Sequence, residues 1–514
     1  MSEDPVDPRA TKGIEQEAAL ALTAAEPAPV ASDSSPAARF GLVAFVRAAG
    51  LLSVSAIANL LRAIITAKLL AVTLGPSTTG VLVQILNFSA LLFQIIPLGL
   101  TIGVSKLVAD NPTSRSRVGA VIGTSSVIAF ASAMTCIIVL APFSNQISLL
   151  LTGTDRYGLP VLLVLLSLPL YNVAGVLSYV IQGLAEIRRL TIANVVTAVT
   201  SLAALIPLTY AYGLTGAVVA IVIASGLQIT FFAAETWRAC AARGWSWSAL
   251  QLSRTTAVSL LRYGGVMMAA GIGSWGSLLV VRTVGIHVLG DFANGIYQVV
   301  NGVSAQYMAV FTGWMAAYVF PRVVAERDHG RLAVTLNSVL RANLLIMGSG
   351  LALTVALREL VVQVLYTPAF ATAAPMLPIQ ALGDYARIIG WTFGIALFAH
   401  DRIRAYLIAM LAQNFLWLLI TIPTLKLAGV AAFAMGYSLS SLAWPIVMYS
   451  LVRKWFGVRI DREGAILCVV GLVGILGPLV LPNGVSLLPV LAVPIAILIM
   501  RQLAQRQAGG RALR

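Results

Sequence analysis

The sequence predicts an all-α polytopic membrane protein with about 14 transmembrane helices. Of its 514 residues, 59% are hydrophobic and only 10% are charged, whereas a soluble domain is about 25% charged. Apolar runs of about 20 residues recur, which is the length a helix needs to cross a bilayer core of about 30 Å. The runs lack the alternation expected of a barrel, and only helices and closed barrels satisfy their backbone in lipid.

Fourteen candidate spans follow one another along the chain. They lie near 42–70, 78–107, 118–141, 159–182, 192–211, 216–237, 256–285, 292–320, 334–357, 376–398, 407–426, 430–451, 464–481 and 484–501. The weakest boundaries are 211–216, 426–430 and 481–484, where only a glycine-containing turn separates two runs.

Basic residues mark every second loop. One set of loops contains Lys106, Arg115, Arg117, Arg188, Arg189, Arg238, Arg243, Arg254, Arg322, Arg327, Arg331, Arg402, Arg404, Arg453, Lys454, Arg459 and Arg462. The alternate loops and loop edges hold only Lys68, Arg156, Arg282, Arg358 and Lys426. Because cytoplasmic loops are enriched in Lys and Arg, both termini are expected in the cytoplasm.

An internal duplication organises the spans. Residues 46–83 align with 261–298 without a gap, so that Arg47 meets Arg262, Leu74-Gly75 meets Leu289-Gly290 and Gly80 meets Gly295. We therefore expect two six-helix lobes in a parallel repeat, with a path for cargo between them. The predicted domains are a disordered tail (1–38), an N-lobe (39–238), a cytoplasmic linker (239–255), a C-lobe (256–452), two extra C-terminal helices (453–501) and a cytoplasmic tail (502–514).

The most informative residue is Arg62, which lies well inside the first span. Each Arg at the centre of a bilayer costs roughly 2.5–3.5 kcal/mol on insertion scales, so it needs a function or a partner. Ser55, Asn59, Arg62 and Thr66 recur at helical spacing and form one polar stripe. The stripe is expected to line a cavity; the alternative is that Arg62 pairs with a buried carboxylate or with backbone carbonyls.

Four further arginines fall within apolar runs. Arg47 and Arg262 are equivalent in the repeat, and they either reach lipid headgroups or guard the inner mouth of a cleft. Arg387 is one turn from Asp384, so the two side chains can touch, either as a self-neutralising pair or with Arg387 facing the cavity. Arg341, in the inner third of its span, is open to both interpretations.

Amides in two spans offer a further possibility. Asn294, Gln298 and Asn301 share one helix face, and Gln84 and Asn87 lie in the span 78–107. They could bond sugar hydroxyls, but amides in membrane helices more often bond neighbouring helices.

Several classes of activity are excluded or disfavoured. There is no GxxxxGK[ST] phosphate loop for ATP hydrolysis. The three histidines and three cysteines form no metal or disulfide pattern, so no metal and no cofactor are expected. The basic residues follow membrane topology, so nucleic acid is not an expected partner. No large outer loop is available for an enzyme such as a polymerase or ligase.

Three segments resemble the polysaccharide transporter family, the Wzx-type O-antigen flippases of the multidrug/oligosaccharidyl-lipid/polysaccharide exporter superfamily. They are KLLAVTLGPSTTGVLVQILNF at 68–88, IPLGLTIGVSKLVAD at 96–110 and FPRVVAE at 320–326. The resemblance implies two lobes around a cationic cavity that binds a polyprenyl-diphosphate-linked oligosaccharide and works by alternating access. It also implies that the membrane is the bacterial cytoplasmic (inner) membrane. Fourteen spans are also typical of lipid-linked peptidoglycan precursor flippases, whose first-span signature is not found here.

These observations favour a transporter rather than an enzyme. The expected activity is flipping of a lipid-linked O-antigen or exopolysaccharide repeat unit, in lipopolysaccharide or polysaccharide biosynthesis, with membrane lipids and other glycan-assembly proteins as possible partners. Arg is suited to bidentate phosphate recognition, so the candidate diphosphate and cavity residues are Arg62, Arg387, Arg341, Arg47, Arg262, Asn59 and Asp384. The alternatives are a drug or cation antiporter of the same superfamily, a membrane glycan polymerase or ligase, and a scaffold.

Overall fold

The computed structural model describes residues 36–97, 100–245, 251–400 and 402–480. Within these ranges only the backbone is described for 36–53, 101–102, 262–267 and 478–480. Most of the predicted N-terminal tail, part of the predicted linker, the last predicted span (484–501) and the C-terminal tail therefore lie outside the described residues.

The chain divides into two compact units, Met1–Gly295 and Ile296–Arg514. The helices of the first unit are α2 (Pro36–Ile95), α3 (Leu100–Ala109), α4 (Arg115–Leu140), α5 (Ser144–Thr152), α6 (Gly158–Gly183), α7 (Ile187–Ala241) and α8 (Arg254–Leu289). Short 3₁₀ turns, η1 (Ala141–Phe143) and η2 (Asp155–Tyr157), lie between α4 and α6. Helix α9 (Asp291–Trp314) crosses the division.

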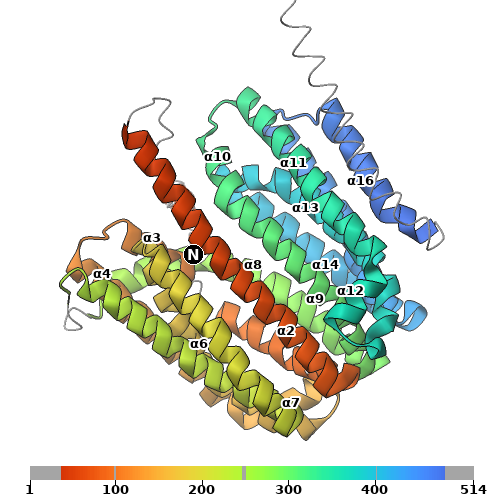
Figure 1. Ribbon diagram of the computed structural model, residues 1–514, viewed down its shortest axis with the longest axis horizontal. Coiled ribbons are helices and arrows are strands. Elements are labelled where there is room, and N and C mark those ends of the chain that lie inside the picture. Colours follow the sequence, from red (N-terminus) through yellow and green to blue (C-terminus); the bar gives the residue numbers. More distant parts are fainter. Residues whose placement is uncertain (1–35, 98–99, 246–250, 401, 481–514) are drawn as a thin grey trace, which may run out of the picture. The chain divides into compact units, whose positions relative to one another are not determined.

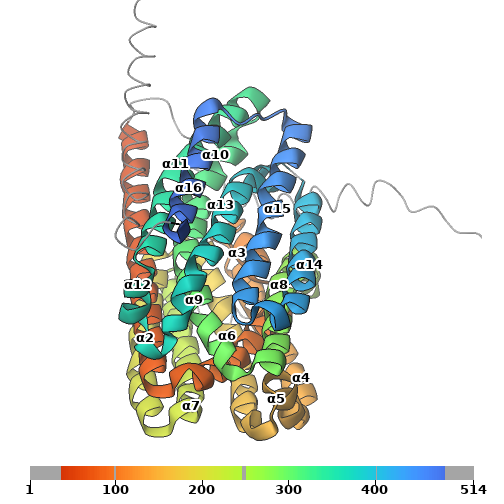
Figure 2. The same cartoon turned by 90° about the vertical axis from the view of Figure 1, so that its right-hand side faces the viewer.

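The second unit continues with a π-helical turn, η4 (Met315–Val319), and a 3₁₀ segment, η5 (Pro368–Met376). Its remaining helices are α10 (Phe320–Ala325), α11 (His329–Ala356), α12 (Arg358–Leu365), α13 (Leu377–Ala399), α14 (Ile403–Ala428), α15 (Ala431–Phe456) and α16 (Arg462–Val480). Helices α11, α13 and α16 run side by side (Figure 1), and α14 lies against α15 (Figure 2).

The predicted fold class is confirmed: the described residues form helices and no strands. Nine of the described helices are long and apolar enough to cross a membrane. Two of these, Val54–Ile95 and Ile187–Ala241, each contain a non-helical glycine where two helices meet, Gly75 and Gly213. Each of these two therefore consists of two helical halves, which correspond to separate predicted spans.

Side chains in the basic loops set where several helices begin. The Ser114 hydroxyl accepts from the Arg117 N–H at the start of α4, and Ser253 does the same for Thr256 N–H at the start of α8. The Asp328 carboxylate accepts from Arg331 N–H at the start of α11. Such N-caps satisfy one of the N–H groups that a helix end leaves without a partner.

Matching glycines support the internal duplication. Gly75 (φ 68°, ψ 180°) and Gly290 (φ 85°, ψ 171°) are repeat equivalents with nearly the same backbone conformation. Gly213 (φ 57°, ψ −131°) and Gly429 (φ 57°, ψ −137°) also share a backbone conformation, although the same alignment places Gly213 on Ala428, one residue before Gly429. Positive φ is available to glycine without a Cβ penalty, so each glycine permits a sharp reversal between two spans.

The equivalent glycines Gly80 and Gly295 also pack reciprocally. A Cβ on Gly80 would lie 2.3 Å from the carbonyl oxygen of Asp291, and one on Gly295 would lie 1.9 Å from that of Pro76. Pro76 and Asp291 are themselves repeat equivalents. The Asn294 amide donates to the Gly80 carbonyl at 2.7 Å, which adds a hydrogen bond to the close packing of these two segments.

Helix α8 belongs to the first unit, although the predicted C-lobe begins at 256. It packs on α2 and α3, and the Gln84 amide of α2 donates to the Thr283 hydroxyl at 2.7 Å and to the Leu279 carbonyl at 3.3 Å. The compact units therefore divide after the first helix of the second repeat, and the predicted lobe boundaries remain a prediction.

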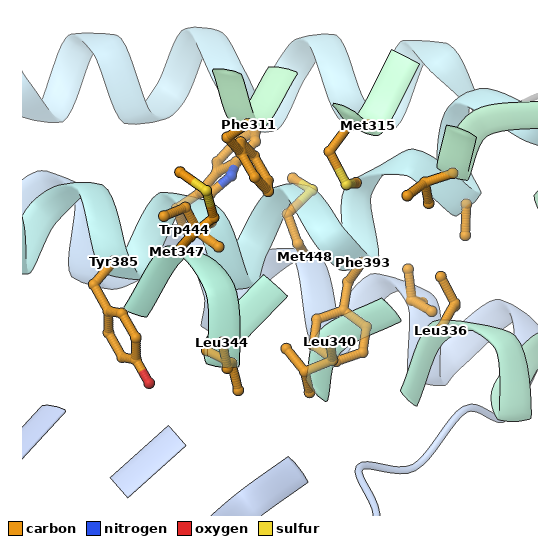
Figure 3. Packing of buried hydrophobic residues seen from close by; sticks show 14 of the residues in the cluster. Phe311, Met315, Leu336, Leu340, Leu344, Met347, Tyr385, Phe393, Trp444 and Met448 are labelled. Atoms are coloured by element: carbon orange, nitrogen blue, oxygen red, sulfur yellow. The ribbon is translucent and has the colours of Figure 1, made fainter. Parts of the chain in front are cut away.

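The core of the second unit is built from large apolar side chains. Phe311, Met347 and Trp444, from α9, α11 and α15, lie together (Figure 3) and are at most 9% exposed. Tyr385 of α13 joins the same cluster, and its hydroxyl donates to the carbonyls of Leu467 and Cys468. These two hydrogen bonds hold α16 against the core.

Candidate functional site

The first half of α2 has two distinct faces. Ile57, Leu61 and Ile65 are exposed apolar side chains, as expected of a face toward lipid. Asn59, Arg62 and Thr66 lie on a different stripe of the helix and line a cavity. The kink at Gly75 turns the chain back, so that the second half of α2 contributes to the same cavity.

The cavity has a volume of about 640 Å³ and lies within the first unit. Pockets of roughly 300–1,000 Å³ hold small molecules or parts of larger ligands. Helices α2, α6, α7 and α8 supply its walls. The polar lining residues are Asn59, Arg62, Thr66, Ser89, Gln94, Tyr171, Asn194, Thr197, Ser201, Ser225, Gln228 and Trp275.

Among the described residues, Arg62 is the only charged one in the lining, and no described carboxylate accompanies it there. It makes no ion pair or hydrogen bond with another described residue. The structure therefore places Arg62 at the cavity and provides no carboxylate partner for it among those residues. A guanidinium that keeps its five N–H donors available can bind an anion in two-pronged fashion.

A second cluster of predicted residues lies within the second unit, around Asp384. Its carboxylate is 0% exposed and accepts hydrogen bonds from the hydroxyls of Ser304 (2.7 Å), Tyr307 and Tyr437 (2.6 Å). Arg387 donates to the Tyr437 hydroxyl at 3.2 Å and lies 4.9 Å from the Trp391 ring. Asp384 and Arg387 are therefore joined through Tyr437 and not by the direct contact that their spacing allowed.

This cluster has the character of a neutralised polar core. Three donors use most of the acceptor capacity of the carboxylate. The half-buried guanidinium is held over the Trp391 and Tyr437 rings, an arrangement that stabilises a partly desolvated cation. The geometry thus favours the self-neutralising interpretation of Asp384 and Arg387.

Arg341 has carboxylate partners that lie far away in the sequence. It pairs with Asp461 at 3.0 Å and with Glu463. The neighbouring Asn337 donates to the Arg459 carbonyl at 2.8 Å and accepts from Asp461 N–H at 3.0 Å. These contacts hold the segment before α16 against α11, so Arg341 is less available to an anionic cargo than Arg62.

The other predicted site residues have different outcomes. Arg47 and Arg262 lie on helices α2 and α8, but their side chains are outside the described part of the structure. The amides of Gln84 and Asn294 bond a neighbouring helix or turn instead of a cavity. Among the described residues no group of His, Cys, Asp and Glu could hold a metal ion.

Sequence reasoning missed the lining contributed by α7. Asn194, Thr197 and Ser201 recur at helical spacing, and Ser225 and Gln228 do the same in the second half of that helix. The same stripe argument that singled out Arg62 could have found them. They carry no charge, so nothing in their composition marked them as costly in a bilayer.

Comparisons with known proteins bear on both the fold and the cavity. No family model matches the sequence. The lipid III flippases of Escherichia coli (strain K12) and Shigella flexneri are each 26% identical to the chain over 411 residues, covering 76% of the chain and 92% of the relative. The resemblance to a lipid-linked oligosaccharide flippase noted above agrees with these relatives.

Solved structures show the same fold at low sequence identity. The lipid II flippase MurJ, in an inward closed conformation, matches with a TM-score of 0.67 at 13% identity, covering 90% of this chain and 99% of that one. An inward-facing multidrug resistance MATE family transporter of the MOP superfamily matches with a TM-score of 0.66 at 14% identity, covering 80% and 98%. The chain is therefore a multi-pass membrane protein with the fold of MOP-superfamily transporters.

Proposed function

We propose that the protein is a flippase that moves a polyprenyl-diphosphate-linked oligosaccharide, an O-antigen or exopolysaccharide repeat unit, from the inner to the outer leaflet of a bacterial cytoplasmic membrane. The observation that carries this proposal is Arg62, a cation without a carboxylate partner among the described residues, in a polar cavity whose lining contains no acid. The similarity to lipid III flippases supports it.

The charge of the cavity favours an anionic cargo. An unpaired Arg inside a transmembrane helix costs roughly 2.5–3.5 kcal/mol, and a bound phosphate offsets that cost. A hydrogen bond to a charged group contributes about 1.5–3 kcal/mol. Arg62 would bind the diphosphate, with Asn59 and Thr66 on the same helix face next to it.

The second candidate function is export of organic cations, which the likeness to a multidrug transporter favours. An organic cation is expected to need a carboxylate in its path, and none of the described residues that line the cavity of the first unit is an acid. Asp384 is fully buried and already accepts three hydrogen bonds. We therefore place the antiporter second.

The proposed orientation follows from the loops. The basic set of loops would face the cytoplasm, which places both termini there. Cargo synthesised on the cytoplasmic side would enter the cavity when its diphosphate binds Arg62. It would leave on the other side after the protein changes from an inward-open to an outward-open conformation.

The experiment uses purified full-length protein in liposomes that contain a polyprenyl-diphosphate oligosaccharide. A membrane-impermeant glycosidase reports the lipid that reaches the outer leaflet. Wild type is compared with Arg62→Ala and Arg62→Lys. The matched control is Arg156→Ala, which removes an exposed arginine in the short turn η2 of the same unit.

We expect wild type and Arg156→Ala to speed the crossing equally. Arg62→Ala should slow it by about ten- to a hundredfold, since about 1.5–3 kcal/mol of charge-assisted hydrogen bonding is lost. Arg62→Lys should fall between them, because an ammonium keeps the charge but loses the two-pronged geometry. A wild type that moves no lipid-linked glycan yet exports organic cations would reverse the order of the two candidates.

A further inference from the structure

The cavity of the first unit contains three carboxamides that the phosphate-binding role of Arg62 does not use. They are Gln94 in the second half of α2, and Asn194 and Gln228 in the two halves of α7. All three are half-buried and line the cavity. None of them has a hydrogen-bond partner among the described residues.

Three other amides of the described chain behave differently. Gln84 bonds α8, Asn294 bonds the Gly80 carbonyl, and the Asn343 amide donates to the Thr392 hydroxyl at 2.9 Å. Those amides join neighbouring segments, which is the usual role of an amide in a membrane helix. Gln94, Asn194 and Gln228 instead line the cavity without a hydrogen-bond partner among the described residues.

Aromatic rings form another part of the same wall. Phe93 and Tyr171 are stacked with ring centroids 4.0 Å apart, and both line the cavity. Trp275 of α8 lines it as well. A sugar ring presents C–H groups on its faces and hydroxyls around its rim, so aromatic surfaces combined with amides match both of its surfaces.

The charge of the lining narrows the choice of sugar. Arg62 is the only charged side chain that the described part of the chain contributes there, and on the proposed function it is occupied by phosphate. A sugar carboxylate in the same cavity would then have no cation to pair with, and an unpaired charge in a partly desolvated site is costly.

We propose that this cavity is a sugar subsite that recognises the sugar next to the diphosphate. It binds an uncharged hexose with hydroxyl or acetamido groups in preference to a uronic acid. Asn194 and Gln228 are the specificity-determining residues, because they face the cavity from a different helix than Arg62. The inference rests on the proposed function, since it uses Arg62 as the phosphate ligand.

The test measures binding to the purified full-length protein in detergent by titration calorimetry with three short-chain polyprenyl diphosphates. One carries a neutral acetamido-hexose, one carries a hexuronic acid, and one carries no sugar. The variants are Asn194→Leu and Gln228→Met, which keep side-chain size and remove the amide. Gln182→Met, which changes an exposed amide of α6 outside the cavity, is the matched control. Thermal unfolding of each variant checks that it is folded.

For wild type and Gln182→Met we expect the neutral sugar lipid to bind about tenfold or more tightly than the other two. Asn194→Leu and Gln228→Met should each weaken binding of the neutral sugar lipid by about three- to tenfold, as expected for one neutral hydrogen bond. They should leave the sugar-free lipid unchanged. Arg62→Ala should weaken all three lipids.

Failure of the sugar subsite and failure of the proposed function give different results. If wild type binds the sugar-free lipid as tightly as the neutral sugar lipid, the subsite is refuted while the phosphate role of Arg62 stands. If the uronic acid lipid binds most tightly, the preference for an uncharged sugar is wrong. If none of the three lipids binds, the proposed function itself fails.

Discussion

Replacing Asp384 by Asn should destabilise the second unit. It should leave the response of transport to a proton gradient unchanged. The carboxylate is 0% exposed and accepts from three hydroxyls. Removing one partner of a buried charged network costs about 3–5 kcal/mol. Because Asn keeps one acceptor oxygen and Arg387 is only half-buried, we expect the lower end, about 3 kcal/mol.

A double-mutant cycle makes this argument sharper. Arg387→Met alone leaves the Asp384 carboxylate without its nearby cation and should also destabilise the protein. Asp384→Asn combined with Arg387→Met removes both charges, so the combined loss should be smaller than the sum by about 1 kcal/mol or more. Reversible unfolding in mild detergent micelles, followed by tryptophan fluorescence, measures each free energy of unfolding.

The result that would refute the reasoning is specific. If Asp384→Asn unfolds at the wild-type midpoint but abolishes the response of transport to a proton gradient, Asp384 is a proton-coupling residue and the self-neutralising interpretation is wrong. If it unfolds earlier and the remaining folded protein responds to pH as wild type does, the polar cluster is structural.

Two further predictions concern the packing at Gly295 and the ion pairs of Arg341. Gly295→Ala should lower the free energy of unfolding by about 1–3 kcal/mol, as overpacking does, because the new Cβ would lie 1.9 Å from the Pro76 backbone. The control is Gly175→Ala, whose Cβ would meet nothing within 4 Å. Equal unfolding free energies for the two variants would contradict this prediction. Arg341→Gln should lower the unfolding free energy by about 1 kcal/mol at low salt and less in 1 M salt, since its ion pairs are partly exposed. Unchanged stability together with lost transport would instead place Arg341 in the cargo path.

The sequence alone was sufficient for the fold class because membrane insertion depends on local properties. The length and apolarity of each run decide whether a segment spans the bilayer, and helical spacing decides which residues share a face. The polar stripe through Arg62 could be found in this way, because Asn59, Arg62 and Thr66 lie on one helix. The glycines at 75 and 290 could be matched from the sequence as well, because residues 46–83 align with 261–298 without a gap.

Only the tertiary structure decided which charged residues have partners. Arg341 was ambiguous in the sequence because its carboxylates, Asp461 and Glu463, lie on the segment leading to α16. Asp384 and Arg387 are one turn apart, yet Tyr437 from α15 joins them. The cavity around Arg62 likewise depends on side chains from α6, α7 and α8. Local spacing contains no information about these contacts, because they exist only once helices distant in the sequence have packed together.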